Sequence, residues 1–176
     1  MRTILFSLLI CITTFAKAAD SKPTPADFLA LYSILPDDAF YRKFGTSFSY
    51  EKAFSDRDAP EIVKGIYGGK PVLTMEHIAK VAVEVREIQA APISGLRFVL
   101  SDLGTRQLRD YLRQPGAKDM VVFIDGHAYA TVSLDLAHQM AEQGVMFIIL
   151  PRPQEPTAYH FLQLLADKLK SAIPNK

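Results

Sequence analysis

The sequence predicts an α+β fold in which a mostly antiparallel sheet carries helices packed on one face. Three observations lead to this class. Short apolar runs such as residues 120–124 alternate with amphipathic helical stretches. Turn residues, above all Asp125-Gly126, join neighbouring strands into hairpins. From residue 72 the expected order is short helix, strand, strand, helix, strand, strand, short helix, strand, helix, and one layer of helices on a sheet is the simplest way to bury those faces.

The first 18 residues have the features of a secretory signal peptide. Arg2 provides the positive charge, residues 4–15 are apolar, and Ala16-Lys17-Ala18 forms a small-x-small cleavage site. The apolar stretch is shorter than the ~20 residues that a membrane helix needs. We therefore expect export to the periplasm, with cleavage after Ala18 and no membrane span in the mature chain. An uncleaved anchor is the alternative, and the residues before Cys11 disfavour a lipoprotein site.

The composition argues against several classes of function. The 176 residues carry 20 Lys+Arg against 19 Asp+Glu, so the chain lacks the basic field that nucleic acid requires. Cleavage after Ala18 removes Arg2 and Lys17 and changes the net charge from +1 to −1. It also removes Cys11, the single cysteine. We therefore expect a mature protein without a disulfide, a thiol nucleophile or a cysteine-bound metal.

Residues 19–69 are predicted to form an aromatic-rich region of helix and loop. Thr24 and Pro25 are typical of a helix start. Residues 45–69 show no clear period, which indicates loop with short helical turns, and Gly68-Gly69 marks the boundary. The helix is predicted from four apolar residues at helical spacing, which are Phe28, Leu31, Tyr32 and Leu35.

Residues 70–176 are predicted to form a regular α+β domain. Thr74 is a suitable N-cap for a short helix over residues 73–78. Alternating polar and apolar residues predict strands at 81–86 and 96–101, joined as a hairpin. Residues 104–114 predict a helix with three apolar residues inward and three arginines outward.

The remaining elements follow from apolar runs and turns. Residues 120–124 predict a strand covered on both faces, and residues 128–134 its hairpin partner. A short helix over 136–143 and a second wholly buried strand over 145–150 come next. Thr157 begins a final helix, whose predicted apolar stripe is Phe161, Leu162, Leu165 and Leu169.

Four pieces of this region occur in the order found in a known domain. Residues 71–78 (PVLTMEHI) form a helix start, and residues 95–108 hold a strand followed by a helix that begins Gly-Thr-Arg. Residues 121–130 form an Asp-Gly hairpin, and residues 145–169 a strand followed by a helix. In these pieces residues 71–169 resemble the periplasmic head subdomain of the SecD/SecDF protein-export subunit. The sequence lacks that family's transmembrane helices, its base region and the proline usual after the hairpin. The resemblance implies a fold, an extracytoplasmic setting and contact with polypeptide.

The sequence contains no recognisable catalytic or metal-binding motif. The histidines show no H-x-x-x-H spacing, G-x-S-x-G is absent, and Gly65–Lys70 lacks the phosphate-loop spacing. We therefore predict a non-enzymatic protein without cofactor or metal. An exported hydrolase is the alternative, and it requires four dispersed residues to converge: His77, Ser133, Asp135 and His138.

These observations together predict an exported binding module that recognises a polypeptide or an envelope protein. An alternative is a component of a larger secretion or envelope assembly that docks through the aromatic region. For the arginines, a solvated helix face is the favoured interpretation. For the aromatics, a covering of the core is favoured, with some of the residues between Phe40 and Tyr50 left on the surface. The candidate partner-binding residues are Phe40, Tyr41, Phe44, Glu84, Arg86, Arg106, Arg109 and Arg113.

Overall fold

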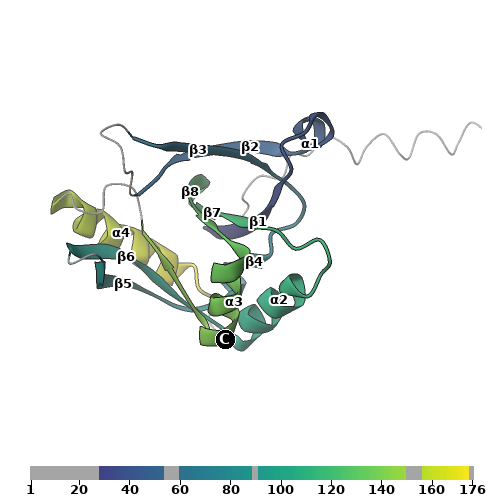
Figure 1. The fold of residues 1–176 in the computed structure, drawn as a ribbon. Helices are drawn as coiled ribbons and strands as arrows, with labels where there is room; N and C mark the ends of the chain where they lie inside the picture. Colours follow the sequence, from purple (N-terminus) through teal and green to yellow (C-terminus); the bar gives the residue numbers. More distant parts are fainter. Residues whose placement is uncertain (1–27, 54–59, 89–90, 150–155, 175–176) are drawn as a thin grey trace, which may run out of the picture.

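The computed structural model describes residues 28–53, 60–88, 91–149 and 156–174. Within these ranges two antiparallel sheets pack with four α-helices, which confirms the predicted α+β class (Figure 1). The strands divide between two sheets, where the simplest arrangement of the predicted elements has one. No helix in the described ranges is long and apolar enough to cross a membrane.

The larger sheet has six strands and curls on itself. Its order is β2 (Thr46–Glu51), β3 (Ile62–Tyr67), β1 (Leu29–Leu35), β7 (Met120–Ile124) and β8 (His127–Val132), with β4 (Leu73–Thr74) also paired to β1. The outermost strands β2 and β8 approach each other. The hydroxyl groups of Tyr50 on β2 and Thr131 on β8 share a hydrogen bond of 3.0 Å, so the sheet is nearly closed.

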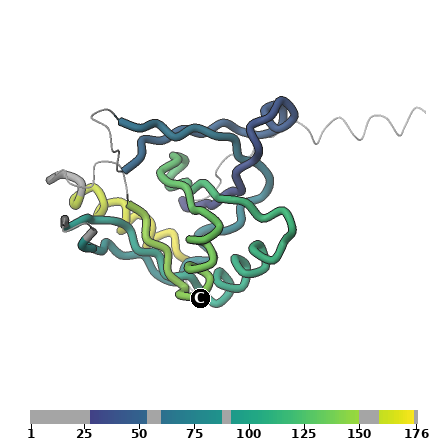
Figure 2. Tube along the Cα trace, in the orientation of Figure 1, coloured from purple at the N-terminus to yellow at the C-terminus, as the bar shows by residue number. Residues whose placement is uncertain are grey.

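The smaller sheet has three strands in the order β5 (Ile78–Ile88), β6 (Ala91–Leu100) and β9 (Val145–Ile148). Helix α4 (Pro156–Ser171) packs on β5 and β6. Helices α2 (Asp102–Leu112) and α3 (Leu134–Gln143) pack on each other, as the chain trace shows (Figure 2). The short helix α1 (Ala39–Phe44) joins β1 to β2, and a single 3₁₀ turn, η1 (Met75–His77), joins β4 to β5.

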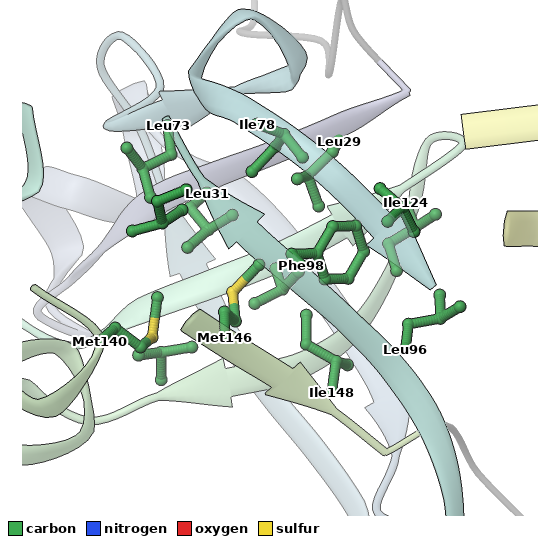
Figure 3. Packing of buried hydrophobic residues seen from close by; sticks show 14 of the residues in the cluster. Leu29, Leu31, Leu73, Ile78, Leu96, Phe98, Ile124, Met140, Met146 and Ile148 are labelled. Carbon is green, nitrogen blue, oxygen red and sulfur yellow. The ribbon is translucent and has the colours of Figure 1, made fainter. Parts of the chain in front are cut away.

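Two hydrophobic cores lie on opposite faces of β1 and β7. The large core receives Leu29 and Leu31 from β1, together with residues of β6, β9 and the helices α2, α3 and α4 (Figure 3). The small core lies inside the curl of the six-stranded sheet. Its buried members are Ala30, Tyr32, Phe48, Tyr67, Val121 and Phe123.

The predicted helix through residues 28–35 is wrong, because this segment forms the central strand β1. Both faces of β1 are buried, so its apolar residues run on without the polar alternation that marks a half-exposed strand. Leu31 contributes to the large core and Tyr32 to the small one. The helical spacing of the apolar residues is a consequence of this double burial. The predicted start at Thr24 and Pro25 lies outside the described residues.

The predicted loop over residues 45–69 is also wrong, because it contains the paired strands β2 and β3. Phe48 lies opposite Gly65 in their register. A Cβ atom on Gly65 would lie 2.6 Å from the Phe48 ring, so the glycine makes room for the aromatic side chain. The predicted division at residues 69 and 70 remains a prediction about domains. The six-stranded sheet contains strands from both sides of this boundary, since β1 pairs with β7.

The regular pattern from residue 72 onward is largely confirmed, except that the short helix predicted over residues 73–78 is the strand β4 followed by the 3₁₀ turn η1. The β5–β6 hairpin, the fully buried β7 and the helices α2, α3 and α4 are present. Asp125 (φ 50°) and Gly126 (φ 79°) form the tight turn, and Gly144 (φ 66°) ends α3. The end predicted for the strand over 128–134 is wrong, because Ser133 accepts a hydrogen bond from the N–H of Leu136 (3.3 Å) and caps α3.

Two predictions of burial near the C-terminus are corrected. In β9 only alternate residues are buried, because one face of the three-stranded sheet is open: Met146 and Ile148 are buried, while Phe147 is partly exposed. Leu150, the predicted end of this strand, lies outside the described residues. In α4 Phe161 is 48% exposed and does not join the buried stripe, which consists of Leu162, Leu165, Ala166 and Leu169.

Candidate functional site

Helix α1 presents exposed aromatic rings to solvent. Phe40 is 66% exposed and Phe44 is 56% exposed, and no residue of this helix is buried. The Phe40 ring lies 5.1 Å from that of Phe44 and 5.3 Å from that of Tyr41, centroid to centroid. We call Phe40, Tyr41 and Phe44 the aromatic face. Three of the predicted partner-binding residues therefore lie together on one exposed surface.

The polar residues that precede α1 hold this short helix in place. Asp38 caps it by accepting a hydrogen bond from the N–H of Tyr41 (2.9 Å). Arg42 donates two hydrogen bonds to the carboxylate of Asp37, at 2.7 and 3.0 Å. These bonds lower the pKa of Asp37, so its charge persists into acid. The helix keeps its shape through these contacts without burying either phenylalanine.

Cations flank the aromatic face. The ammonium nitrogen of Lys118 lies 5.7 Å from the ring centroid of Tyr41, and that of Lys43 lies 5.7 Å from the ring centroid of Phe44. Both distances lie within reach of a cation–π interaction. The surface therefore combines apolar rings with positive charge at its margin.

A depression of about 550 Å³ lies between α1 and the strands β2 and β3. The charged residues Asp37, Arg42 and Lys64 line it, and so do the apolar residues Phe48 and Ile66. Hydrogen-bonding groups and apolar surface thus meet in this depression, whose lining includes Arg42 of α1 but none of the three rings of the aromatic face. Such a mixture suits a ligand with both a polar backbone and apolar side chains.

The predicted pair Glu84 and Arg86 lies on the other sheet. Arg86 Nε donates to Glu84 Oε1 at 2.6 Å, and Arg97 Nε lies 3.1 Å from Glu84 Oε2. The guanidinium carbon of Arg86 lies 4.1 Å from the ring centroid of Phe147. The two residues form a network across the open face of the three-stranded sheet, and they do not join the aromatic face.

The arginines of α2 are exposed as predicted, yet each has a partner within the chain. Arg106 donates to the carbonyl of Asp102 at 3.4 Å, and Arg113 pairs with Asp110 at 3.5 Å. Arg109 donates to the carbonyl of Ala141 at 3.0 Å. The last contact links α2 to α3. These contacts favour the interpretation of the stripe as a solvated helix face.

The four residues of the hydrolase hypothesis form no joint site, and two of them, His77 and Ser133, cap helical turns. The N–H of Thr74 donates to His77 Nδ1 at 3.1 Å, which closes a capping box around η1. Ser133 caps α3, while Asp135 and His138 are exposed on that helix. In the described part of the chain, no hydrogen bond or ion pair joins any two of these four. The same part holds no group of three or more His, Cys, Asp or Glu residues suited to a metal ion.

Phe147 belongs to the network around Glu84 and Arg86, and the sequence pattern did not indicate this. A Cβ atom on Gly95 would lie 2.6 Å from the Phe147 ring, so this ring lies over the glycine and beneath Arg86. A glycine in the middle of a strand is a usable signal for such cross-strand cover. The link from Arg109 to Ala141 has no such signal, because it joins residues 32 positions apart.

Neither a scan against protein-family models nor a search of curated proteins finds a match to this sequence. The exposed surfaces of the chain are therefore the basis for assigning a function.

Proposed function

We propose that the protein is an exported, non-enzymatic binding module that recognises a polypeptide through the aromatic face of α1. The observation that carries this proposal is the exposure of Phe40 and Phe44 on a helix without a buried residue. Covering apolar surface is favourable by about 25 cal/mol per Å². Aromatic side chains are also enriched among the residues that dominate protein interfaces.

The surroundings of the aromatic face favour a polypeptide as the ligand. An apolar side chain of the ligand can pack against the rings of Phe40 and Phe44. Its peptide groups or carboxylates can hydrogen-bond to Lys64 in the depression between α1 and the strands β2 and β3, where Arg42 is already paired with Asp37. A peptide supplies both kinds of group along one chain, whereas a purely apolar ligand would make no hydrogen bond to the charged residues that line the depression.

Two expectations from the sequence support the same proposal. The predicted signal peptide supports a location outside the cytoplasm, in the periplasm. The resemblance of residues 71–169 to the SecD/SecDF head subdomain supports contact with polypeptide.

Site-specific photo-crosslinking in the cell envelope tests the proposal. A photoreactive amino acid replaces Phe40 or Phe44, and a matched variant carries it at Leu103, which is 45% exposed on α2. We expect polypeptide adducts from positions 40 and 44 at several times the yield obtained from position 103. Equal yields at the three positions would contradict the proposal.

A binding measurement with a permanently unfolded, fluorescent polypeptide gives the second readout. We expect the double variant Phe40→Ser/Phe44→Ser to bind this probe at least ten times more weakly than the unchanged chain. Its free energy of unfolding should change by less than about 0.5 kcal/mol per site, because both side chains are exposed. Unchanged affinity in the folded double variant would remove α1 as the binding site.

A further inference from the structure

Strand β5 forms an open edge of the three-stranded sheet. Its eleven residues pair with β6 along one side. Among the residues that the structure describes, no strand pairs with the other side. An unpaired edge presents a row of backbone N–H and C=O groups that can pair with a further strand, and natural proteins protect such edges with bulges, lysines and other charges.

The protection of β5 is confined to one end. The register with β6 shifts between Ile78 and Lys80, and from Lys80 to Ile88 it continues without interruption. Lys80 itself is exposed at the bulged end. The segment from residue 81 to residue 87 therefore has the regular geometry that strand addition requires.

Two of the three long charged side chains in this segment, those of Glu84 and Arg86, make contacts over the neighbouring strands. Glu84 contacts Arg97 on the neighbouring strand β6. Arg86 reaches over β6 to the ring of Phe147 on β9. Both side chains therefore lie across the sheet and leave the backbone of β5 accessible.

The sequence around Val85 is complementary to itself. In an antiparallel pair of identical strands centred on Val85, Val85 lies opposite Val85 of the other copy. Glu84 then lies opposite Arg86 of the other copy, and the two-fold symmetry repeats this opposite-charge pair. A register centred on this residue thus joins one apolar pair and two ion pairs, for which Glu84 and Arg86 exchange their contact within each chain for contacts between the copies.

Apolar surface beside the edge is also available for burial. Val81 on β5 is buried, whereas Val85 on the same face is 53% exposed, so the apolar face of the strand extends beyond the core. Helix α4, which packs on β5, leaves Phe161 48% and Leu164 59% exposed. Edge-to-edge pairing about a two-fold axis places both copies of α4 on the same face of the joined sheet.

We propose that a second copy of this chain docks on β5 in antiparallel register, with Val85 at the two-fold axis. The two three-stranded sheets then form one sheet of six strands, in which β5 is no longer an edge. This interface is separate from the aromatic face of α1, so a test of one proposal does not decide the other.

Analytical ultracentrifugation of the purified chain tests the proposal, because it measures the mass in solution over a range of concentrations. We expect a reversible dimer. Val85→Lys places two lysines at the axis, and Glu84→Arg and Arg86→Glu each replace two opposite-charge pairs by like-charge pairs. Each change should weaken the dimer at least about tenfold. The control is Ile62→Lys, which replaces a similarly exposed apolar residue (51%) on the other sheet and should leave the dimer intact.

A mixing experiment makes the register itself testable. The Glu84→Arg chain and the Arg86→Glu chain restore both ion pairs when they meet each other. A tagged Glu84→Arg chain should therefore retain the untagged Arg86→Glu chain at least about ten times better than it retains a second Glu84→Arg chain. Thermal unfolding of each variant confirms that it folds.

Three results would overturn the proposal. The first is an unchanged chain that stays monomeric at its highest soluble concentration. The occupant of the β5 edge would then be a different extended polypeptide and not a second copy. The second is a dimer that Val85→Lys does not weaken. The third is a pair of folded charge variants that shows no preference for the mixed complex.

Discussion

The two cores on either side of β1 and β7 differ in the side chains that fill them. The large core is aliphatic, with Phe98 and Tyr111 as its only buried aromatic residues in the described part of the chain. In the small core four of the six buried residues are aromatic. The ring of Phe123 lies 4.7 Å from that of Tyr67 and 5.8 Å from that of Tyr32, centroid to centroid.

This difference follows from how many elements reach each core. Two sheets and three helices deliver side chains to the large core, so many aliphatic residues fill it. The small core lies inside a single curled sheet, and few side chains point into it. Large rings then fill the space, and small residues such as Ala30 and Gly65 make room for them. Because β1 and β7 serve both cores, we expect the two to unfold together.

Phe98→Ala tests the large core and should have the largest effect. The side chain is fully buried on β6, so its truncation leaves a cavity and should lower the free energy of unfolding by about 3–5 kcal/mol. Urea unfolding measures the change, with the exposed Phe44→Ala as the control. A loss below about 1 kcal/mol would show that the large core collapses around the missing ring.

Phe123→Ala tests the small core and the coupling between the two. The loss of a buried ring and its contacts with Tyr32 and Tyr67 should lower the free energy of unfolding by about 3 kcal/mol. Fluorescence and far-ultraviolet circular dichroism, followed in one urea titration, should report the same midpoint. Two separated midpoints would mean that the cores unfold independently.

Gly104→Ala tests a backbone contact beside the large core. A Cβ atom at this position would lie 2.3 Å from the carbonyl oxygen of His77, and a backbone atom cannot easily move aside. We expect destabilisation of about 1–3 kcal/mol from overpacking, although alanine favours the helix. At Gly116 a Cβ atom would meet nothing within 4 Å, so Gly116→Ala is the control and should be close to neutral. Equal stability of the two variants would contradict this prediction.

Tyr67→Phe tests how the stability of the small core depends on pH, and it should have the smallest effect. Burial raises the pKa of the Tyr67 phenol, so the folded protein holds this proton more tightly than the unfolded chain does. The resulting stability is present below about pH 10, the ordinary value of the unfolded phenol, and is lost as the pH rises through the folded pKa. Urea unfolding between pH 8 and pH 11 should show a less steep loss in Tyr67→Phe than in the half-exposed control Tyr159→Phe. Parallel curves would count against a buried, neutral phenol.

Local signals explain why the elements after residue 72 could be predicted. Asp125-Gly126 adopts the positive φ values that its residue types allow, and Ser101 accepts a hydrogen bond from the N–H of Gly104 as the cap of α2. Gly144 ends α3 for the same local reason. None of these signals needs a distant partner.

The predictions that failed concern residues whose surroundings come from elsewhere in the chain. Strand β1 is covered by β7 and by both cores, so its own pattern resembles a helix. For the candidate site, the sequence identified Phe40 and Phe44 but could not decide between exposure and burial. Their exposure depends on whether other segments pack against α1.

By itself the sequence determined the α+β class, the two hairpins after residue 72 and the position of most elements in that region, because these depend on neighbouring residues. Only the tertiary structure decided that the strands form two sheets and that β1 separates two cores. It also decided that the arginines of α2 are paired while the rings of α1 remain exposed. These features depend on contacts between distant residues, and burial and pairing are properties of the folded chain that local sequence does not encode.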